Sequence, residues 1–266
     1  MALLIFDGPE FPAPLGALSP WMDHFVEPME KVHADLAAQE HRRFIKTHTP
    51  LDGLPFREEV RYVCVGRDPR DAVLSMAHHR ANLDLERYAA LVDANRPDDI
   101  ESPPPSGPRT LEEEFYRLLD RPDEDFPAWT IQFLVHQYTT YWDHRDQPNV
   151  ELFHFADYLA DLPGEITRLA SHLGIETDRS HAERLAEHAS IDRARARAAR
   201  IAPEANLGIW KQDQGFFRSG SSGEWREEMT PAQEEKYDES IAQLAPPDLA
   251  RWMHHGWGGR LRGATP

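Results

Sequence analysis

Two side chains in the first third of the chain have the types and the spacing of an anion-binding site. The stretch Val60 to Arg80 reads VRYVCVGRDPRDAVLSMAHHR, in which Arg67 follows a β-branched run and Ser75 comes eight residues later. A guanidinium presents a planar fork of donors that suits phosphate, and open α/β sheets bind ligands where their strands end. The pattern indicates an anion site beside Arg67. An ordinary strand–turn–helix crossover, in which Arg67 pairs with Asp71, fits the same spacing.

A lysine and a histidine offer a second kind of chemistry, the transfer of a group. Lys46 and His48 lie two residues apart in the sequence HRRFIKTHTP, which we expect to form a short strand starting at Phe44. Side chains two apart on a strand share a face, so an ammonium and an imidazole would point the same way. The alternative is that His48 is only a polar residue at a strand end. The sequence contains 14 histidines, so the presence of one histidine is little evidence of catalysis.

Regular elements must position these side chains, and the sequence predicts several of them. Apolar and β-branched runs predict buried strands at residues 61–65 and 150–155. Asp68 is a suitable N-cap and Pro69 a suitable first residue for the helix that follows. The proline-rich residues 1–28 are predicted to be extended. Apolar spacing predicts further helices at residues 27–40, 111–119, 126–145, 166–173 and 179–188, the fourth of them ended by Gly174.

These elements favour an α/β fold with a mostly parallel central sheet flanked by helices, in a single domain over residues 1–266. The sequence has 29 basic and 46 acidic residues, a net charge of −17, which argues against a nucleic-acid surface. Cys64 is the only cysteine, so the chain forms no internal disulfide, as is usual in the reducing cytoplasm where we place the protein. No apolar run reaches the length of a membrane span, and no cysteine–histidine cluster predicts a metal site.

Three blocks of the sequence resemble the cytosolic-type sulfotransferases, in the order and spacing of that family. VRYVCVGRDPRDAVLS resembles the segment that holds the 3'-phosphate of 3'-phosphoadenosine 5'-phosphosulfate (PAPS), KTHTPLDGLP resembles the catalytic KTH block, and GFFRSGSSGEWREEMTPAQ resembles RKGxxGDWKxxFTxxQ. The resemblance implies a bacterial sulfotransferase with a P-loop-type fold, transferring a sulfuryl group from PAPS to a hydroxyl or an amine of a small-molecule or lipid acceptor. The product of the donor is adenosine 3',5'-bisphosphate, and no metal is implied.

The same resemblance assigns roles to individual residues. His48 would be the base that takes the proton of the acceptor, and Lys46 would stabilise charge on the leaving oxygen or on the sulfuryl group. The residues implied to bind the nucleotide are Arg67, Ser75, Arg218 and Gly220 at the 3'-phosphate, with Phe155 and Ser190 near the adenine.

The chain also departs from the family pattern. The YPKSGTTW-like loop that wraps the 5'-phosphosulfate has no counterpart, so the first βα unit is missing, and we expect a truncation at the start, with real loss of the loop as the alternative. Ser219 stands where the family has a lysine, and Phe155 stands where it has a tyrosine. A non-catalytic relative that binds the nucleotide or a partner without transfer is therefore the alternative function.

The sequence leaves the acceptor open. Residues 93–108 form a long, acidic, proline-rich loop that suits either a lid over the acceptor or an exposed loop without function. Residues 226–235 overlap a short dimer motif of the family, but Arg226 and Pro231 replace its lysine and valine. A homodimer is thus only weakly supported, because Pro231 also fits the start of a helix capped by Thr230.

Overall fold

The computed structural model describes residues 1–97, 110, 112–113, 116–117 and 130–258. Its contacts divide these residues into two compact units. The first unit consists of residues 1–48, 79–97 and 180–220, and the second of residues 49–78, the described residues from 110 to 179, and 221–258. The predicted helix at 111–119, most of the 93–108 loop and the first turn of the predicted 126–145 helix lie outside the described residues. The single domain over residues 1–266 stays a prediction.

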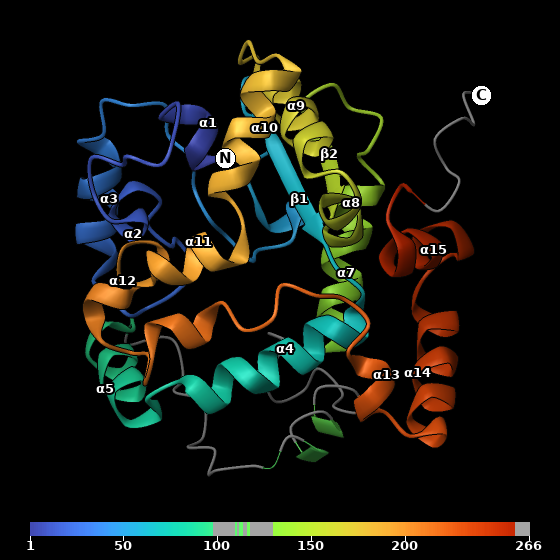
Figure 1. Ribbon diagram of the computed structural model, residues 1–266. Helices are drawn as coiled ribbons and strands as arrows, with labels where there is room; N and C mark the ends of the chain where they lie inside the picture. The colour runs from blue at the N-terminus through green and yellow to red at the C-terminus, as the bar shows by residue number, and fades with distance from the viewer. Residues whose placement is uncertain (98–109, 111, 114–115, 118–129, 259–266) are drawn as a thin grey trace. The chain divides into compact units, whose positions relative to one another are not determined.

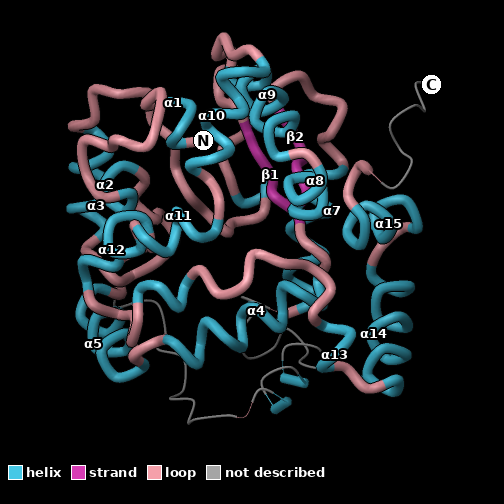
Figure 2. Tube along the Cα trace, viewed as in Figure 1, coloured by secondary structure: helices cyan, strands magenta, loops and turns pink. Residues whose placement is uncertain are grey.

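The sheet of the second unit has two parallel strands, β1 (Tyr62–Gly66) and β2 (Val150–His154), which lie side by side (Figure 2). Tyr62 pairs with Val150 and Gly66 with His154, so both strands end at the same level. This confirms the α/β class and the parallel pairing. The second predicted strand is one residue too long, because His154 ends β2 and caps the next helix by accepting a hydrogen bond from Ala156 N.

The helices of the second unit begin and end where local signals place them. Asp161 and Gly174 close the two ends of α9, and Gly174 has the left-handed conformation (φ +67°) of a helix C-cap. Thr230 and Gln233 form a capping box at the start of α14. The helices are the first part of α4 (Pro69–Asn82), α7 (Ile131–Trp142), α8 (Phe155–Ala160), α9 (Leu162–Leu173), α13 (Trp225–Glu228), α14 (Pro231–Leu244) and α15 (Pro247–His255), with a 3-10 turn, η1 (Leu51–Gly53).

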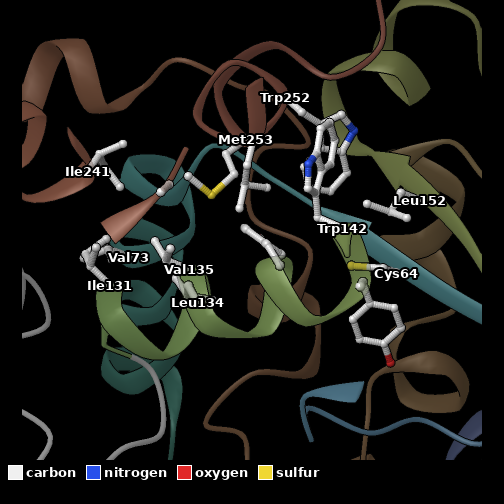
Figure 3. Close-up of a cluster of buried hydrophobic side chains, with 14 of the residues drawn as sticks. Cys64, Val73, Ile131, Leu134, Val135, Trp142, Leu152, Ile241, Trp252 and Met253 are labelled. Carbon is white, nitrogen blue, oxygen red and sulfur yellow. The ribbon is translucent and has the colours of Figure 1, made fainter. Parts of the chain in front are cut away.

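An apolar core joins these elements to the sheet (Figure 3). Helix α7 contacts both strands, and α15 packs against α7. Trp252 of α15 is fully buried, with its ring 5.8 Å from that of Trp142 and 5.6 Å from that of Tyr138. Gly66 is required at the end of β1, because a Cβ atom there would lie 2.4 Å from the Trp252 ring. The core therefore fixes the point at which the chain leaves β1.

The first unit is built from short helices and turns (Figure 1). The prediction of an extended segment at residues 1–28 was wrong in two places, where α1 and α2 form single helical turns. Pro14 starts α2 without strain because a helix start needs no N–H at that position. The helices are α1 (Ala2–Ile5), α2 (Leu15–Leu18), α3 (Met29–Ala37), α5 (Leu85–Asn95), α10 (Arg179–His188), α11 (Ile191–Ala196) and α12 (Ala198–Ile201), with 3-10 turns η2 (Ala205–Leu207) and η3 (Asp213–Phe216).

The strand predicted from Phe44 was also wrong, since only one residue of it pairs. Lys46 forms an isolated parallel bridge with Trp21, and a second isolated bridge joins Leu83 to Trp210. Pro50 closes the run soon after Lys46, which leaves too few residues for a ladder. The bridge is still informative, because it places Trp21 beside Lys46.

Candidate functional site

Arg67 occupies the turn between β1 and α4, and its backbone is held from α7. The Tyr138 hydroxyl accepts a hydrogen bond from Arg67 N at 3.1 Å and donates one to Arg67 O at 3.3 Å. Burial raises the pKa of this hydroxyl, so it stays neutral and can do both. The predicted hinge arginine is thus anchored by a side chain far away in the sequence.

The guanidinium of Arg67 lies between an aromatic ring and a backbone carbonyl. Its Cζ is 4.9 Å from the centre of the Phe155 ring, and its Nη2 donates to Ser221 O at 3.2 Å. Phe155 can be there because it is the first residue of α8, directly after β2. The structure therefore brings together Arg67 and Phe155, two residues that the sequence resemblance assigned to one nucleotide.

A buried carboxylate holds the segment Ser221 to Trp225 against the first turn of α4. Asp71 is 1% exposed, and its Oδ2 accepts hydrogen bonds from Ser222 Oγ at 2.7 Å and from Gly223 N at 2.6 Å. Trp225 N lies 3.4 Å from its Oδ1. In the sequence, Asp71 was considered only as a residue suited to the helix start and as a possible partner of Arg67. Its hydrogen bonds to residues 222 and 223 were not predicted, although Asp71 belongs to the first, and these residues to the third, of the blocks that resemble the family.

Ser75 lies one turn after Asp71 on α4, and residues four apart share a face of a helix. Its side chain is half-buried. Ser75 therefore lies on the same face of α4 as the Asp71 carboxylate, which binds the 221–225 segment. The carbonyl of Ser221, the first residue of that segment, accepts a hydrogen bond from Arg67. A contact between Ser75 and a phosphate stays a prediction.

The remaining nucleotide residues lie in the first unit. Arg218 is exposed, and its carbonyl accepts a hydrogen bond from Arg195 of α11. Gly220 has φ +69° and packs on Ile191, whose Cβ would be 3.2 Å from a Cβ at Gly220. Ser190 is exposed at the N-cap of α11, and its side chain makes no capping bond. The structure thus places Gly220 against the side chain of Ile191, the residue that follows Ser190.

Lys46 and His48 meet at the ring of Trp21. The Lys46 Nζ lies 3.8 Å from the Trp21 ring centre, and the His48 ring centre lies 4.7 Å from it. Asp23 fixes the backbone beside them, because its Oδ2 accepts from His48 N at 2.7 Å and from Thr47 Oγ1 at 2.8 Å. We call Trp21, Asp23, His24, Lys46 and His48 the Trp21 cluster.

The sequence did not single out His24, whose ring stacks on Trp21 at 4.3 Å. Its Nε2 lies 2.8 Å from the hydroxyl of Tyr88 on α5. The isolated bridge between Trp21 and Lys46 brings Trp21 to this site. No local sequence pattern connects Tyr88 to the Trp21 cluster.

Burial dominates the electrostatics of the Trp21 cluster. Burial and then the Lys46 ammonium lower the pKa of His48 to about 4, against the opposing influence of Asp23. The same two causes lower the pKa of His24 to about 4. Burial also lowers the pKa of Lys46, whereas Glu204 and Asp23 raise it. Both imidazoles are therefore neutral at pH 7, and His48 can accept a proton.

The predicted site residues fall into two groups. Arg67, Ser75 and Phe155 belong to the second unit, and Lys46, His48, Ser190, Arg218 and Gly220 belong to the first. Within the described ranges, no three histidine, cysteine or acidic side chains are grouped as metal ligands. None of the helices placed by the structure combines the length and the apolar character needed to cross a bilayer.

Comparisons with known proteins agree on one family. Solved structures similar in fold include a mouse sulfotransferase complexed with PAP (TM-score 0.64, 19% identity, covering 85% of this chain and 73% of that one). Another is a retinol dehydratase complexed with androsterone and PAP (TM-score 0.65, 22% identity, covering 89% and 74%). Glycolipid sulfotransferases of Mycobacterium bovis and Mycobacterium tuberculosis are 46% identical over 96% of this chain and over 83% and 82% of their own lengths. The model of the sulfotransferase domain family matches residues 6–254, and the chain therefore belongs to the sulfotransferase family.

Proposed function

We propose that this sulfotransferase moves the sulfuryl group of PAPS to a hydroxyl of a glycolipid. The observation that carries the proposal is the Trp21 cluster, in which a neutral imidazole and an ammonium, His48 and Lys46, share one aromatic ring. The acceptor class is supported by the 46% identity to enzymes named glycolipid sulfotransferases. The donor is supported by the PAP bound in two structures that are similar in fold.

The transfer needs one base and one stabilising charge. The acceptor oxygen forms a bond to sulfur, the bond from sulfur to the phosphate oxygen breaks, and that oxygen leaves with the electron pair. His48 accepts the proton of the acceptor hydroxyl, because burial and Lys46 keep its imidazole neutral. Lys46 offsets the charge that develops on the leaving oxygen.

Nucleotide contacts are proposed in each of the two units separately. Arg67 offers the phosphate a planar cation, with Phe155 as a neighbouring aromatic surface. Ser75, Ser190, Arg218 and Gly220 complete the proposed set of nucleotide contacts. Ser219 supplies no charge where the family has lysine, so Arg67 and Arg218 carry the recognition of the 3'-phosphate.

Calorimetric titration with adenosine 3',5'-bisphosphate tests the donor half. We expect saturable binding that is lost with adenosine 5'-phosphate, which lacks the 3'-phosphate. Arg67→Ala should weaken binding about 10- to 100-fold, the value of one or two charge-assisted hydrogen bonds. Arg57→Ala, the same change at an exposed arginine, is the control. Equal affinity of a folded Arg67→Ala protein and the control would refute the phosphate assignment.

A transfer assay with labelled PAPS and a glycolipid tests the acceptor half. Transfer to the glycolipid, and none to a simple phenol or steroid, is the expected result. Nucleotide binding without transfer to any of these acceptors would overturn the proposal in favour of the non-catalytic alternative.

A further inference from the structure

Helix α5 is held in the first unit by polar contacts with the segment that carries the Trp21 cluster. The structure describes all of α5, and none of its side chains is fully buried. A helix of this length is marginal in water on its own, so it needs partners elsewhere in the fold. Two of its side chains, Tyr88 and Asn95, form hydrogen bonds with residues 64 and 69 positions earlier in the sequence.

Tyr88 and Asn95 share one face of α5. They lie seven residues apart, close to two helical turns, so their side chains point the same way. The Tyr88 hydroxyl lies 2.8 Å from His24 Nε2, and Asn95 Nδ2 donates to Val26 O at 3.2 Å. Val26 is itself buried, which fixes the second of these contact points. One face of α5 thus holds the chain just after Trp21.

His24 has one hydrogen-bond partner among the described residues, the hydroxyl of Tyr88. Its other ring nitrogen, Nδ1, is buried and has no partner in that part of the chain. A pKa of about 4 keeps the imidazole neutral at pH 7, and a hydroxyl can pair with Nε2 in either tautomer because it both donates and accepts. The orientation of the His24 ring therefore depends on Tyr88.

The His24 ring in turn limits the position of Trp21. The two rings stack with their centres 4.3 Å apart and their planes at 29°. The Lys46 ammonium lies 3.8 Å from the Trp21 ring centre, and the backbones of Trp21 and Lys46 form a bridge. A cation–π contact requires the ring to lie beneath the charge, so a shift of the indole would displace the ammonium.

We propose that Tyr88 is a positioning residue of the transfer centre, which holds the Lys46 ammonium in place through His24 and Trp21. The inference rests on the proposed role of Lys46 in sulfuryl transfer. Tyr88 acts through its hydrogen bond alone, since burial raises the pKa of its hydroxyl and keeps it protonated. Position matters here because a displacement of about 1 Å at a reacting centre can lower a rate about 100-fold.

Kinetics of conservative variants test the role in transfer. Tyr88→Phe keeps the ring and removes the hydroxyl, and we expect kcat to fall about 3- to 10-fold, the value of one hydrogen bond. The KM for PAPS should not change, because the proposed nucleotide contacts include neither Tyr88 nor His24. His24→Phe should have the same effect, since a phenyl ring can stack on Trp21 but cannot bind the hydroxyl. The double variant should lose no more than either single variant, because both changes break the same contact.

The matched control is Tyr158→Phe, the same change at a tyrosine of the other unit. The Tyr158 ring stacks on Phe153, and its hydroxyl binds none of the described residues. This variant should keep the wild-type kcat and KM.

A magnetic resonance experiment tests the positioning without any turnover. Lysine occurs in the sequence only at positions 31, 46, 211 and 236, so ¹³C-labelled lysine gives few Cε–Hε signals, and Lys46→Arg identifies that of Lys46. Protons above an aromatic face are shielded by its ring current. The Lys46 signal should therefore lie upfield of the others, and Trp21→Leu should abolish this shift. In Tyr88→Phe and in His24→Phe the signal should lie between those of the wild type and Trp21→Leu.

The outcomes separate this inference from the proposed function. If Tyr88→Phe is folded by circular dichroism and keeps the wild-type Lys46 signal, the positioning is refuted, whatever its turnover. A Lys46 signal that Trp21→Leu does not move refutes it as well. If the signal moves but an active protein keeps its kcat in Tyr88→Phe, the hydroxyl does not serve transfer and the proposal fails. If the signal moves as expected but the wild type transfers no sulfuryl group, the hold on Lys46 stands and the proposed function fails.

Discussion

The carboxylate of Asp71 should determine how firmly the 221–225 segment is held on α4. Two hydrogen bonds to its Oδ2, from Ser222 Oγ at 2.7 Å and Gly223 N at 2.6 Å, are bonds to a charged acceptor in a buried site. Such bonds contribute about 1.5–3 kcal/mol each, and bonds to a neutral acceptor about 0.5–1.5 kcal/mol. Asp71→Asn keeps the shape and loses the charge.

The arithmetic follows from those two bonds. In Asp71→Asn each bond changes from a charged to a neutral acceptor, a loss of about 1 kcal/mol each and about 2 kcal/mol in total. In Asp71→Ala both bonds are lost, which gives about 4 kcal/mol. The free energy of unfolding should therefore fall in two steps of similar size.

Urea denaturation of the wild type, Asp71→Asn and Asp71→Ala measures this series. We expect the midpoint to move to lower urea concentration and the slope to stay unchanged. Asp146→Asn, an exposed aspartate of the same unit, is the control and should lie within about 0.5 kcal/mol of the wild type. A loss below about 0.5 kcal/mol for Asp71→Asn would refute the reasoning, since it would mean that the charge contributes nothing. A weaker affinity for adenosine 3',5'-bisphosphate should accompany the loss, because the same segment supplies the carbonyl that accepts from Arg67.

Three further changes test other parts of the structure. His48→Ala should abolish sulfuryl transfer and leave nucleotide affinity unchanged in calorimetry; retained turnover would remove His48 as the base. Gly66→Ala should cost about 1–3 kcal/mol in urea denaturation, because its Cβ would lie 2.4 Å from the buried Trp252 ring; an unchanged midpoint would contradict that contact. His24 is held neutral with a pKa of about 4, so the unfolded chain binds more protons between pH 6.5 and 4, and stability should fall as pH drops through that range, by at most about 3 kcal/mol from His24. His24→Gln should flatten this part of the pH–stability curve, and an unchanged curve would show that its imidazole is not buried in its neutral form.

Sequence reasoning succeeded where the signal was local. The strand up to Gly66 and the helix from Pro69 were predicted from neighbouring residues, and Asp68 caps that helix by accepting from Arg70 N at 3.0 Å. The end of α9 at Gly174 and the start of α14 after Thr230 were equally local. Each of these depends on the conformational preference of one or two residues, which the sequence displays directly.

Sequence reasoning failed where the answer depended on distant partners. The run at Phe44 has strand-forming residues, but a strand needs a neighbour, and only Lys46 finds one, at Trp21. The burial of Glu204 follows from the folding of the 203–208 turn, which no periodicity reveals. Arg67 and Phe155 were assigned to one ligand by resemblance, and only the structure shows their side chains in contact.

Trp21 has a consequence for how this family member can vary. The indole ring of Trp21 contacts one ammonium group and two imidazoles, those of Lys46, His24 and His48. Changes in residues that share a partner do not add, so a replacement tolerated at one of these positions alters the effect of a replacement at the next. The effect of a single replacement around Trp21 therefore depends on the residues present at the other three positions, and single variants of this cluster do not predict the behaviour of a multiple variant.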